Sequence, residues 1–384
     1  MVDSVKGFRD ITGEEAEKRI AIRNIIENVF RIYGFEAVET PVIEYEDFVK
    51  GNNSSDEAVS DIFKLEDRGK RKLALRYEFT FQLKRLAMNK KLPFKRYQIG
   101  NVFRDEPTGE NRFRQFTQCD CDVVGSSVRD EAEILKIAAE IFDKLGIKVS
   151  ININNRKLLN EILEKQGVKS EFKQEVIKEL DKIDKLSEKE IKENLKKFNA
   201  EKILDIFKKP ANFFEKYDSY KEILELEKEC SKNKVKINFV PFLARGLSYY
   251  NGSIFEIKTS DKNIRETISA GGSYLVNGIQ STGISFGLDR LAGIANIKEE
   301  LKDKILIISL GQDKKAIELA NKIRKENRIC VVMYGKVTKA LEYANSYGFN
   351  KVVFIGDEEV KKKKILMKDM KTGKEKLVNE KEVL

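Results

Sequence analysis

Three windows of this sequence use arginine without lysine, although lysine is far the commoner of the two in the whole chain. No Lys occurs in 96–135, 237–257 or 263–297. The arginines of these windows are Arg96, Arg104, Arg112, Arg114, Arg129, Arg245, Arg265 and Arg290. A guanidinium grips a phosphate or carboxylate at two points and can lie flat on a purine, whereas an ammonium is a point charge. The windows therefore predict sites that bind a nucleotide or a related anion.

The segment 112–124 supports this prediction because its residues alternate in character. In an extended chain, successive side chains point to opposite faces. One face would carry Arg112, Arg114, Phe116, Gln118, Asp120 and Asp122, and the other Phe113, Gln115, Thr117, Cys119, Cys121 and Val123. A half-exposed antiparallel strand would explain the alternation but not the absence of Lys. We therefore expect the first face to bind a nucleotide and a small polar ligand.

The composition limits the chemistry that this chain can perform. Its 384 residues are 41% hydrophobic, which allows two or three domains with cores, and they include no His. Without the commonest general base, most hydrolase triads are excluded, so catalysis must come from carboxylates, arginines, a metal or the substrate. The four Cys residues have neither a zinc nor a disulfide spacing, and we expect them to be reduced and structural. No metal-ligand set is predicted.

The charge and the terminus bear on partners and location. A formal net charge of +10 suits a polyanionic partner such as nucleic acid. A Lys/Glu-rich surface from a thermophilic or compositionally biased proteome would give the same charge. Nothing at the N-terminus resembles a signal peptide, and no run approaches the roughly 18 apolar residues of a membrane span. We expect a soluble, cytoplasmic protein that makes no membrane contact.

Periodicity and turn residues predict the elements that would position these side chains. Helices are expected over 13–33, 78–89 and 129–145, and the Lys/Glu-rich stretch 155–234 is expected to be an inserted helical module. Strands are expected within 35–43, 61–75, 97–104, 112–124, 237–241 and 253–258. The sequence Ala270-Gly-Gly-Ser predicts a turn, and 283–291 is expected to run into a helix. Alternating strands and helices over 305–355 predict a small, mostly parallel α/β domain.

Several motifs in order resemble the histidyl-tRNA synthetase family of the class II aminoacyl-tRNA synthetases. Motif 1 is similar to Gly34-Phe-Glu-Ala-Val-Glu-Thr-Pro, motif 2 to Phe103-Arg-Asp-Glu with Arg112-Phe-Arg-Gln-Phe-Thr-Gln, and motif 3 to Gly287-Leu-Asp-Arg-Leu. The peptide peculiar to the family resembles Leu243-Ala-Arg-Gly-Leu-Ser-Tyr-Tyr, and its amino-group-binding segment resembles Leu75-Arg-Tyr-Glu-Phe-Thr. A pattern of its helical insertion is similar to Asp181-Lys-Ile-Asp-Lys. The resemblance covers nearly the whole chain.

The resemblance implies an α/β (α+β) fold, with an antiparallel class II sheet flanked by helices. The catalytic core would comprise 1–154 and 235–300, the helical insertion 155–234, and a small C-terminal α/β domain of the anticodon-binding type 301–384. Implied partners are ATP, histidine, tRNA(His) and a second copy of the chain in a homodimer. Mg²⁺ bridging the phosphates is implied as a cofactor.

The resemblance also implies roles for individual residues. Arg104, Arg245 and Arg290 would be catalytic, with Arg104 at the α-phosphate of ATP, Arg290 at the γ-phosphate, and Arg245 near the α-phosphate and the histidine carboxylate. The ATP site would also include Glu106, Arg112 and Phe116, with Phe116 stacked on the adenine. The histidine site would include Glu78, Thr80, Gln118, Asp122, Arg245, Tyr249, Tyr250 and Tyr274. A neutral imidazole has one donor and one acceptor, which a carboxylate at Asp122 and a phenol at Tyr250 would match.

The implied activity is that of a histidine–tRNA ligase, which makes histidyl-adenylate and transfers the histidyl group to the 3′ end of tRNA(His). The chain departs from the family pattern at Ser248, Ser273 and Leu275, where the family tends to have Asp, Arg and Asp. One alternative is a silent synthetase-like paralogue, of the kind that serves as a regulatory subunit in histidine biosynthesis. Another class II specificity or a pure RNA-binding protein also remains open.

Overall fold

The computed structural model describes residues 3–51, 59, 61–109, 112–183, 186–246, 248–260, 267–297 and 304–384. The chain divides into two compact units, Met1–Ile297 and Lys298–Leu384, which are described separately. Of the residues singled out above, Asp184, Lys185, Leu247 and Arg265 lie outside the described residues. Within the described ranges, no helix is long and apolar enough to cross a membrane.

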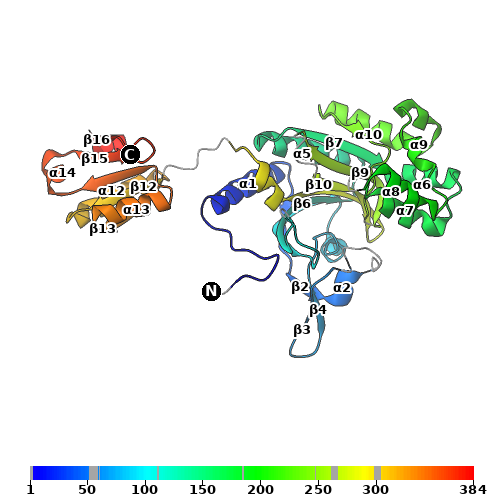
Figure 1. Ribbon diagram of the computed structural model, residues 1–384, viewed down its shortest axis with the longest axis horizontal. Helices are drawn as coiled ribbons and strands as arrows, with labels where there is room; N and C mark the ends of the chain where they lie inside the picture. The colour runs from blue at the N-terminus through cyan, green and yellow to red at the C-terminus, as the bar shows by residue number, and fades with distance from the viewer. Residues whose placement is uncertain are drawn as a thin grey trace. The chain divides into compact units, whose positions relative to one another are not determined.

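The first unit is built on an eight-stranded sheet with the order β1-β5-β6-β11-β10-β9-β7-β8 (Figure 1). Its strands are β1 (Glu36–Ala37), β5 (Phe94–Phe103), β6 (Gln115–Val124), β7 (Val149–Asn155), β8 (Asn238–Phe239), β9 (Tyr250–Thr259), β10 (Thr267–Val276) and β11 (Ile279–Gly287). The short edge strands pair in parallel and the six inner strands pair antiparallel. A mainly antiparallel sheet can bury one face and leave the other for a site.

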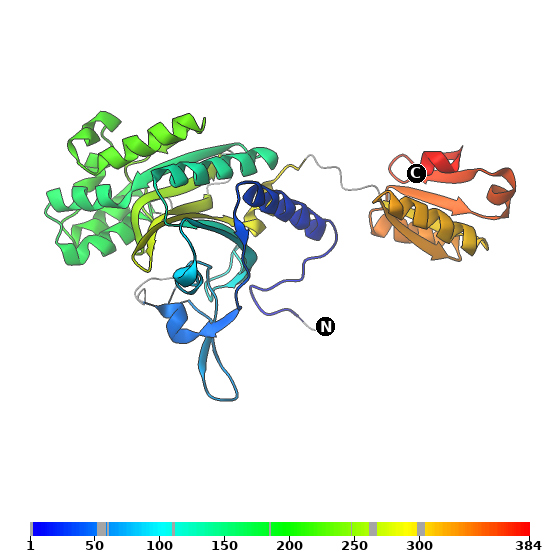
Figure 2. The same ribbon diagram turned by 180° about the vertical axis from the view of Figure 1, so that it is seen from behind.

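Three helices cover one face of this sheet. These are α1 (Gly13–Ile32), α5 (Val128–Lys144) and α11 (Leu288–Ile294), and α1 and α5 lie next to each other in both views (Figures 1 and 2). Phe286 of β11 packs between Phe30 of α1 and Phe142 of α5, with ring centroids 6.1 and 5.6 Å away. A capping box at Ser127 and Asp130 satisfies the first amides of α5. The helices predicted over 13–33 and 129–145 are confirmed.

The stretch 155–234 forms helices, as its composition predicted. They are α6 (Arg156–Lys165), η2 (Ser170–Phe172), α7 (Lys173–Leu180), α8 (Glu188–Lys196), α9 (Ile203–Phe207), η3 (Ala211–Lys216) and α10 (Tyr220–Lys232). In Figure 1 these green helices gather at one end of the unit, beside β7 and β9. The apolar side chains of α6 to α10 join the same core as those of the sheet. These helices are therefore packed onto the sheet of the first unit.

A small sheet with the order β2-β4-β3 projects from this unit (Figure 2). It contains β2 (Ile43–Tyr45), β3 (Lys64–Glu66) and β4 (Lys72–Leu75), and α2 (Glu46–Lys50), α4 (Leu83–Leu86) and η1 (Ala87–Asn89) follow its strands. The helix predicted over 78–89 is wrong at its start, because helix begins only at Leu83. Arg76 and Gln82 explain this, since they donate to the carbonyls of Thr40 at 2.7 Å and Pro41 at 3.1 Å. These bonds hold the segment between them in a non-helical conformation.

The turn predicted at Ala270-Gly-Gly-Ser is also wrong, because these residues lie inside β10. Gly271 pairs with Ile284 of β11, and the strands approach so closely that a Cβ on Gly271 would overlap the Gly283 carbonyl oxygen. The glycines permit close contact between two backbones here, which is their second common use besides turns. Similarly, residues 283–287 belong to β11, and the helix that follows begins at Leu288.

The second unit has a five-stranded sheet with the order β13-β12-β14-β15-β16. Its elements are β12 (Lys304–Ser309), α12 (Asp313–Lys325), β13 (Ile329–Tyr334), α13 (Val337–Ser346), β14 (Lys351–Ile355), α14 (Asp357–Lys362), β15 (Ile365–Asp369), β16 (Glu375–Val378) and α15 (Glu380–Val383). The first three strands are parallel, as predicted, and the last two are antiparallel. Alternate residues of β12 enter separate cores on the two faces.

Candidate active site

The uncovered face of the large sheet carries a row of buried polar side chains on β5 and β6. The register of these strands places Arg96 opposite Asp122 and Gln98 opposite Asp120, and Gln118 lies next along β6. We call these five residues the polar row. Cys119 and Cys121 point the other way into the core, and all four cysteines are free and buried, as predicted. Burial of so many polar groups is costly unless they serve a ligand or one another.

Asp122 is the centre of the polar row. A guanidinium nitrogen of Arg96, Nη2, lies 2.7 Å from Asp122 Oδ2, and the Tyr274 hydroxyl donates to Asp122 Oδ1. Burial raises the pKa of the Asp122 carboxyl, while Arg96 and Tyr274 oppose that rise. Both contacts favour a carboxylate over a carboxylic acid. Arg96 was not assigned a role from the sequence, although the register of a β5–β6 hairpin would have placed it opposite Asp122.

Three other members of the polar row have oxygen atoms that accept no hydrogen bond from the described residues. These are Gln98 Oε1, Gln118 Oε1 and Asp120 Oδ1. The Gln118 side chain is oriented by its Nε2, which donates to Ser285 Oγ at 2.7 Å. Burial and the nearby Asp122 raise the pKa of Asp120 to about 8. Gln118 can therefore present a carbonyl oxygen to a ligand donor, and Asp120 is protonated at neutral pH.

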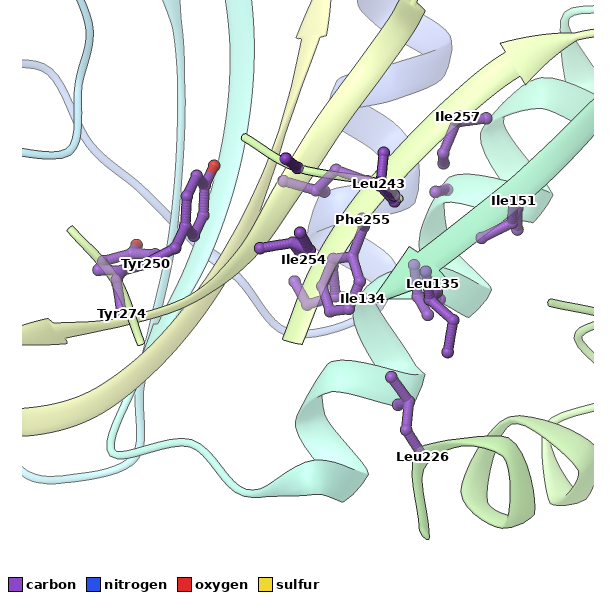
Figure 3. Packing of buried hydrophobic residues seen from close by; sticks show 14 of the residues in the cluster. Ile134, Leu135, Ile151, Leu226, Leu243, Tyr250, Ile254, Phe255, Ile257 and Tyr274 are labelled. Atoms are coloured by element: carbon purple, nitrogen blue, oxygen red, sulfur yellow. The ribbon is translucent and has the colours of Figure 1, made fainter. Parts of the chain in front are cut away.

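Aromatic side chains and Glu78 enclose the next part of the site. The Tyr249 ring lies 4.7 Å from Tyr250 and 5.6 Å from Tyr274 between centroids, and its hydroxyl is 3.5 Å from Glu78 Oε2. Figure 3 shows Tyr250 and Tyr274 beside each other, apart from the aliphatic cluster. Burial raises the pKa values of all three phenols, so they remain hydrogen-bond donors. Thr80 lies two residues beyond Glu78 and is partly buried.

A second group of predicted residues meets at the end of β5. Arg104 Nε donates to the carbonyl of Tyr77 at 3.1 Å. Tyr77 is the residue directly before Glu78, so the Arg104 side chain lies near the Glu78 backbone. Its guanidinium carbon lies 5.1 Å from the centre of the Phe116 ring. Glu106 pairs with Arg112 and lies 3.7 Å from Arg104 Nη1. The structure thus brings together Arg104, Glu106, Arg112 and Phe116, four of the five residues assigned to ATP.

The strand face predicted over 112–124 is wrong at its start, because β6 begins only at Gln115. Arg114 precedes the strand and does not share the predicted face with Gln118 and Asp122. It forms an ion pair with Asp105 at 3.1 Å. The cause is that the N-terminal segment around Gly7 lies beside Arg114, whose amide donates to the Gly7 carbonyl at 2.9 Å. The Arg114 carbonyl in turn accepts from the Arg104 amide at 2.8 Å. Such a long-range contact is not visible in a periodic pattern.

The other two predicted arginines come from separate elements. Arg245 lies in the segment between β8 and β9, with Nη1 3.5 Å from Glu256 Oε1 on β9. Burial opposes the charge of Arg245, but Tyr250, Asp181 and Glu256 outweigh it and raise the pKa. Arg290 lies on α11 and donates to the Thr267 carbonyl at 2.6 Å. Arg245 is next to the tyrosine group, while Arg290 is anchored on β10.

Asp289 is a further residue that the sequence reasoning missed. Its carboxylate is 2.7 Å from Arg19 Nη1 on α1 and accepts from the Thr117 amide of β6 at 2.8 Å. One side chain therefore joins α11, α1 and β6 beneath the site. Only the neighbouring Arg290 was assigned a role from the sequence, as a phosphate contact. The contacts of Asp289 fix the helix that carries Arg290.

The departures from the family pattern have partners of their own where the structure describes them. Ser273 donates to Glu131 Oε1 on α5, and burial raises the pKa of Glu131. Leu275, two residues further along β10, is half-exposed. The small hydroxyl of Ser273 thus satisfies a buried carboxyl.

The same fold occurs in a solved histidyl-tRNA synthetase from Nostoc sp. PCC 7120, with a TM-score of 0.84 and 25% identity over 100% of this chain and 99% of that one. The fold is that of an aminoacyl-tRNA synthetase. The family model described as histidyl-tRNA synthetase matches residues 7–291. Histidine–tRNA ligase 1 of Bacillus cereus is 36% identical, and the match covers 97% of this chain and 96% of the relative. The chain belongs to the histidyl-tRNA synthetase family.

Both the resemblance and the mixed α/β fold predicted from the sequence are thereby confirmed. A structure from Bacillus halodurans, described as an ATP phosphoribosyltransferase regulatory subunit/histidyl-tRNA synthetase, has a TM-score of 0.79 over 92% of this chain and 98% of that one. Its identity is 18%, so this likeness concerns the fold alone. Since one fold can serve different functions, activity must be argued from the site.

Proposed function

We propose that this chain is a histidine–tRNA ligase, which activates histidine with ATP and transfers it to the 3′ end of tRNA(His). The observation that carries the proposal is the pairing of Asp122 with Arg96 and Tyr274 beside Tyr250, in a member of this family. A buried carboxylate next to a phenol offers one acceptor and one donor to a neutral imidazole. No other common amino acid side chain presents that combination on a flat ring.

In the first step, a histidine carboxylate oxygen attacks the α-phosphorus of ATP in line. The bond from that phosphorus to the bridging oxygen breaks, and pyrophosphate leaves with its electron pair. Arg104 would hold the α-phosphate, Arg290 the γ-phosphate, and Arg245 the charge shared between the α-phosphate and the attacking carboxylate. Because the nucleophile is already ionised, the step requires positioning and charge stabilisation rather than a protein base. Absence of His does not hinder it.

ATP and histidine would lie at the two groups of side chains described above. Phe116 would stack on adenine, with Glu106 and Arg112 beside it. The contact between Arg104 and Phe116 supports this, since it brings the residue proposed for the α-phosphate next to the residue proposed for adenine. Glu78 and Thr80 would hold the histidine ammonium. Asp122 would accept from one imidazole nitrogen and Tyr250 would donate to the other. Gln118, Tyr249 and Tyr274 would orient the amino acid, since the first offers a free carbonyl oxygen and the tyrosines enclose the site.

Mg²⁺ is expected to accompany the ATP phosphates, where it would neutralise their charge. In the part of the chain that the structure describes, no three Asp, Glu or Cys side chains are grouped as a metal site. Glu256, which pairs with Arg245, is also 3.5 Å from Lys258 Nζ. This carboxylate is therefore paired with protein cations. We extend the proposal to a cytoplasmic homodimer, as the family resemblance implies.

The test is exchange of pyrophosphate into ATP, measured with histidine, with a panel of other amino acids and without amino acid. Histidine alone should support exchange. The Asp122→Asn variant keeps the shape of the side chain but loses its charge, so KM for histidine should rise at least about a hundredfold while KM for ATP changes less than about threefold. A folded protein that binds histidine without any exchange would instead be a silent paralogue.

A further inference from the structure

The segment 241–246, which carries Arg245 into the site, is held by side chains rather than by a strand ladder. Four of its carbonyl oxygens accept hydrogen bonds from three residues of 154–174. Asn154 Nδ2 donates to the carbonyls of Pro241 and Leu243, each at 2.9 Å. Arg156 Nη1 donates to the Arg245 carbonyl at 3.2 Å, and Gln174 Nε2 donates to the Gly246 carbonyl at 3.3 Å. The last two donors belong to the helical insertion.

Arg156 and Gln174 also hold each other. Arg156 is the first residue of α6, and Gln174 is the second residue of α7. Arg156 Nη2 donates to Gln174 Oε1, so the amide must turn its nitrogen toward Gly246. The Arg156 side chain is 5% exposed, and a guanidinium so buried is stable only when its donors are used. This pair therefore has a defined geometry.

Asp181 is a third residue of the insertion that lies near the same peptide. It follows α7 directly, and its Oδ2 lies 3.1 Å from the point where a Cβ on Gly246 would stand. A side chain at position 246 would press against this carboxylate. Asp181 also brings a negative charge near the guanidinium of Arg245. The insertion thus contacts the Arg245 peptide through both α6 and α7.

The guanidinium of Arg245 has weaker support than its backbone. Its ion pair with Glu256 is 3.5 Å long, and Nε has no hydrogen-bond partner among the described residues. The position of this charge is therefore set mainly by where the main chain lies. We propose that Arg156 and Gln174 are positioning residues that fix Arg245 for adenylate formation, so that the helical insertion controls the activation step. The inference rests on the proposed function.

The first test is the rate of histidine-dependent ATP–pyrophosphate exchange in Arg156→Ala and Gln174→Ala. Each variant should lower kcat by about tenfold to a hundredfold, because small misplacements of a charge that acts in the transition state are costly there. KM for ATP should change less than kcat. Lys157→Ala is the matched control, since Lys157 is the next residue of α6 and its exposed side chain pairs with Glu222. It should behave as wild type.

A double-mutant cycle separates positioning from general damage. If Arg156 and Gln174 act through Arg245, then neither substitution should reduce exchange further in an Arg245→Ala background. A further loss equal to that in the wild-type background would overturn the inference, as would wild-type activity in both single variants. Gln174→Ala, at a partly buried position, keeps the test valid if the Arg156 variant does not fold.

Hydrogen–deuterium exchange of peptides from 241–250 provides a readout that does not depend on activity. Both single variants should exchange faster there than wild type, whereas Lys157→Ala should not. If wild type shows no ATP–pyrophosphate exchange, the proposed function fails, and this measurement alone decides whether the insertion holds the Arg245 segment. Unchanged protection in both variants would overturn the inference.

Discussion

Arg96 favours the charged form of the buried Asp122 carboxyl and so opposes the rise in its pKa that burial causes. Neither side chain is appreciably exposed, so both pay a large desolvation cost that a single ion pair does not always repay. The gain lies in function, because a carboxylate held beside a guanidinium and a phenol is a ready acceptor for an imidazole N–H. The second carboxyl, Asp120, has no such ion pair of its own. Burial and the nearby charge of Asp122 raise its pKa to about 8, although Arg96 opposes that rise.

The raised pKa of Asp120 predicts a pH-dependent stability. In the unfolded chain this carboxyl ionises near its usual pKa of about 4, but in the folded chain it holds its proton until about pH 8. The folded state therefore binds more protons between these values, and wild type loses stability as pH rises through that range. Asp120→Asn lacks this loss. Its advantage in the free energy of unfolding should grow from about pH 5 to about pH 8.

Urea unfolding followed by circular dichroism checks this prediction at several pH values. The exposed Asp218 is the matched control, because Asp218→Asn changes charge without changing a buried group. That variant should stay parallel to wild type at every pH. A constant offset between Asp120→Asn and wild type would mean that Asp120 is ionised throughout, contrary to its surroundings.

The sequence predicted the part of this site that depends on local alternation. Gln118, Asp120 and Asp122 share a face, and Cys119 and Cys121 the other, because the strand period of two is fixed by the backbone. The pairing of Asp122 with Arg96 depends on the register of the β5–β6 hairpin, which the strand period of two does not fix. The contacts that remove Arg114 from that face are contacts with Gly7, far away in sequence.

At the scale of elements, the approach of β10 to β11 decides where the site face can lie. Gly271 and Gly283 allow the two backbones to come together, and a Cβ on Gly283 would overlap the Asp122 carboxylate. Composition alone predicted a turn here, since glycine is common in turns. Because Gly283 has no Cβ, the Asp122 carboxylate can lie directly beside its backbone. The glycines therefore serve the site as well as the sheet.

Gly271→Ala should destabilise the catalytic unit by about 2 to 5 kcal/mol, because the atoms that the new methyl group meets are backbone and cannot rotate away. Ile284 Cα would be 2.8 Å from the new Cβ. Gly293→Ala is the matched control in the next element, α11, where no atom lies within 4 Å of the added Cβ. It should be neutral or stabilising by about 0.5–1 kcal/mol.

Thermal unfolding of both variants and wild type measures this difference. Loss of stability in Gly271→Ala together with no loss in Gly293→Ala would match the close approach of the strands. Equal behaviour of the two variants would show that β10 and β11 can separate at little cost, which would contradict the packing described here.

At the scale of the whole molecule, the two units have independent cores. The large core ends with the partly buried Ile297, and the two clusters of the second unit consist of residues from Ile305 onward. Every residue assigned to ATP or histidine lies in the first unit. The alternation of strands and helices predicted the parallel half of the second unit, but not β15 and β16, because short antiparallel strands after a Lys-rich segment have a weak pattern.

A chain that ends at Ile297 should therefore fold and retain histidine-dependent ATP–pyrophosphate exchange within about threefold of the full chain, since it keeps the whole core and both ligand groups. Charging of tRNA(His) should fall at least about tenfold, because the removed unit carries many of the lysines available for phosphate contacts. Exchange and aminoacylation measured on the same preparations would separate the two steps. Loss of exchange from a folded truncated chain would show that the second unit takes part in activation, and undiminished charging would remove it from tRNA binding.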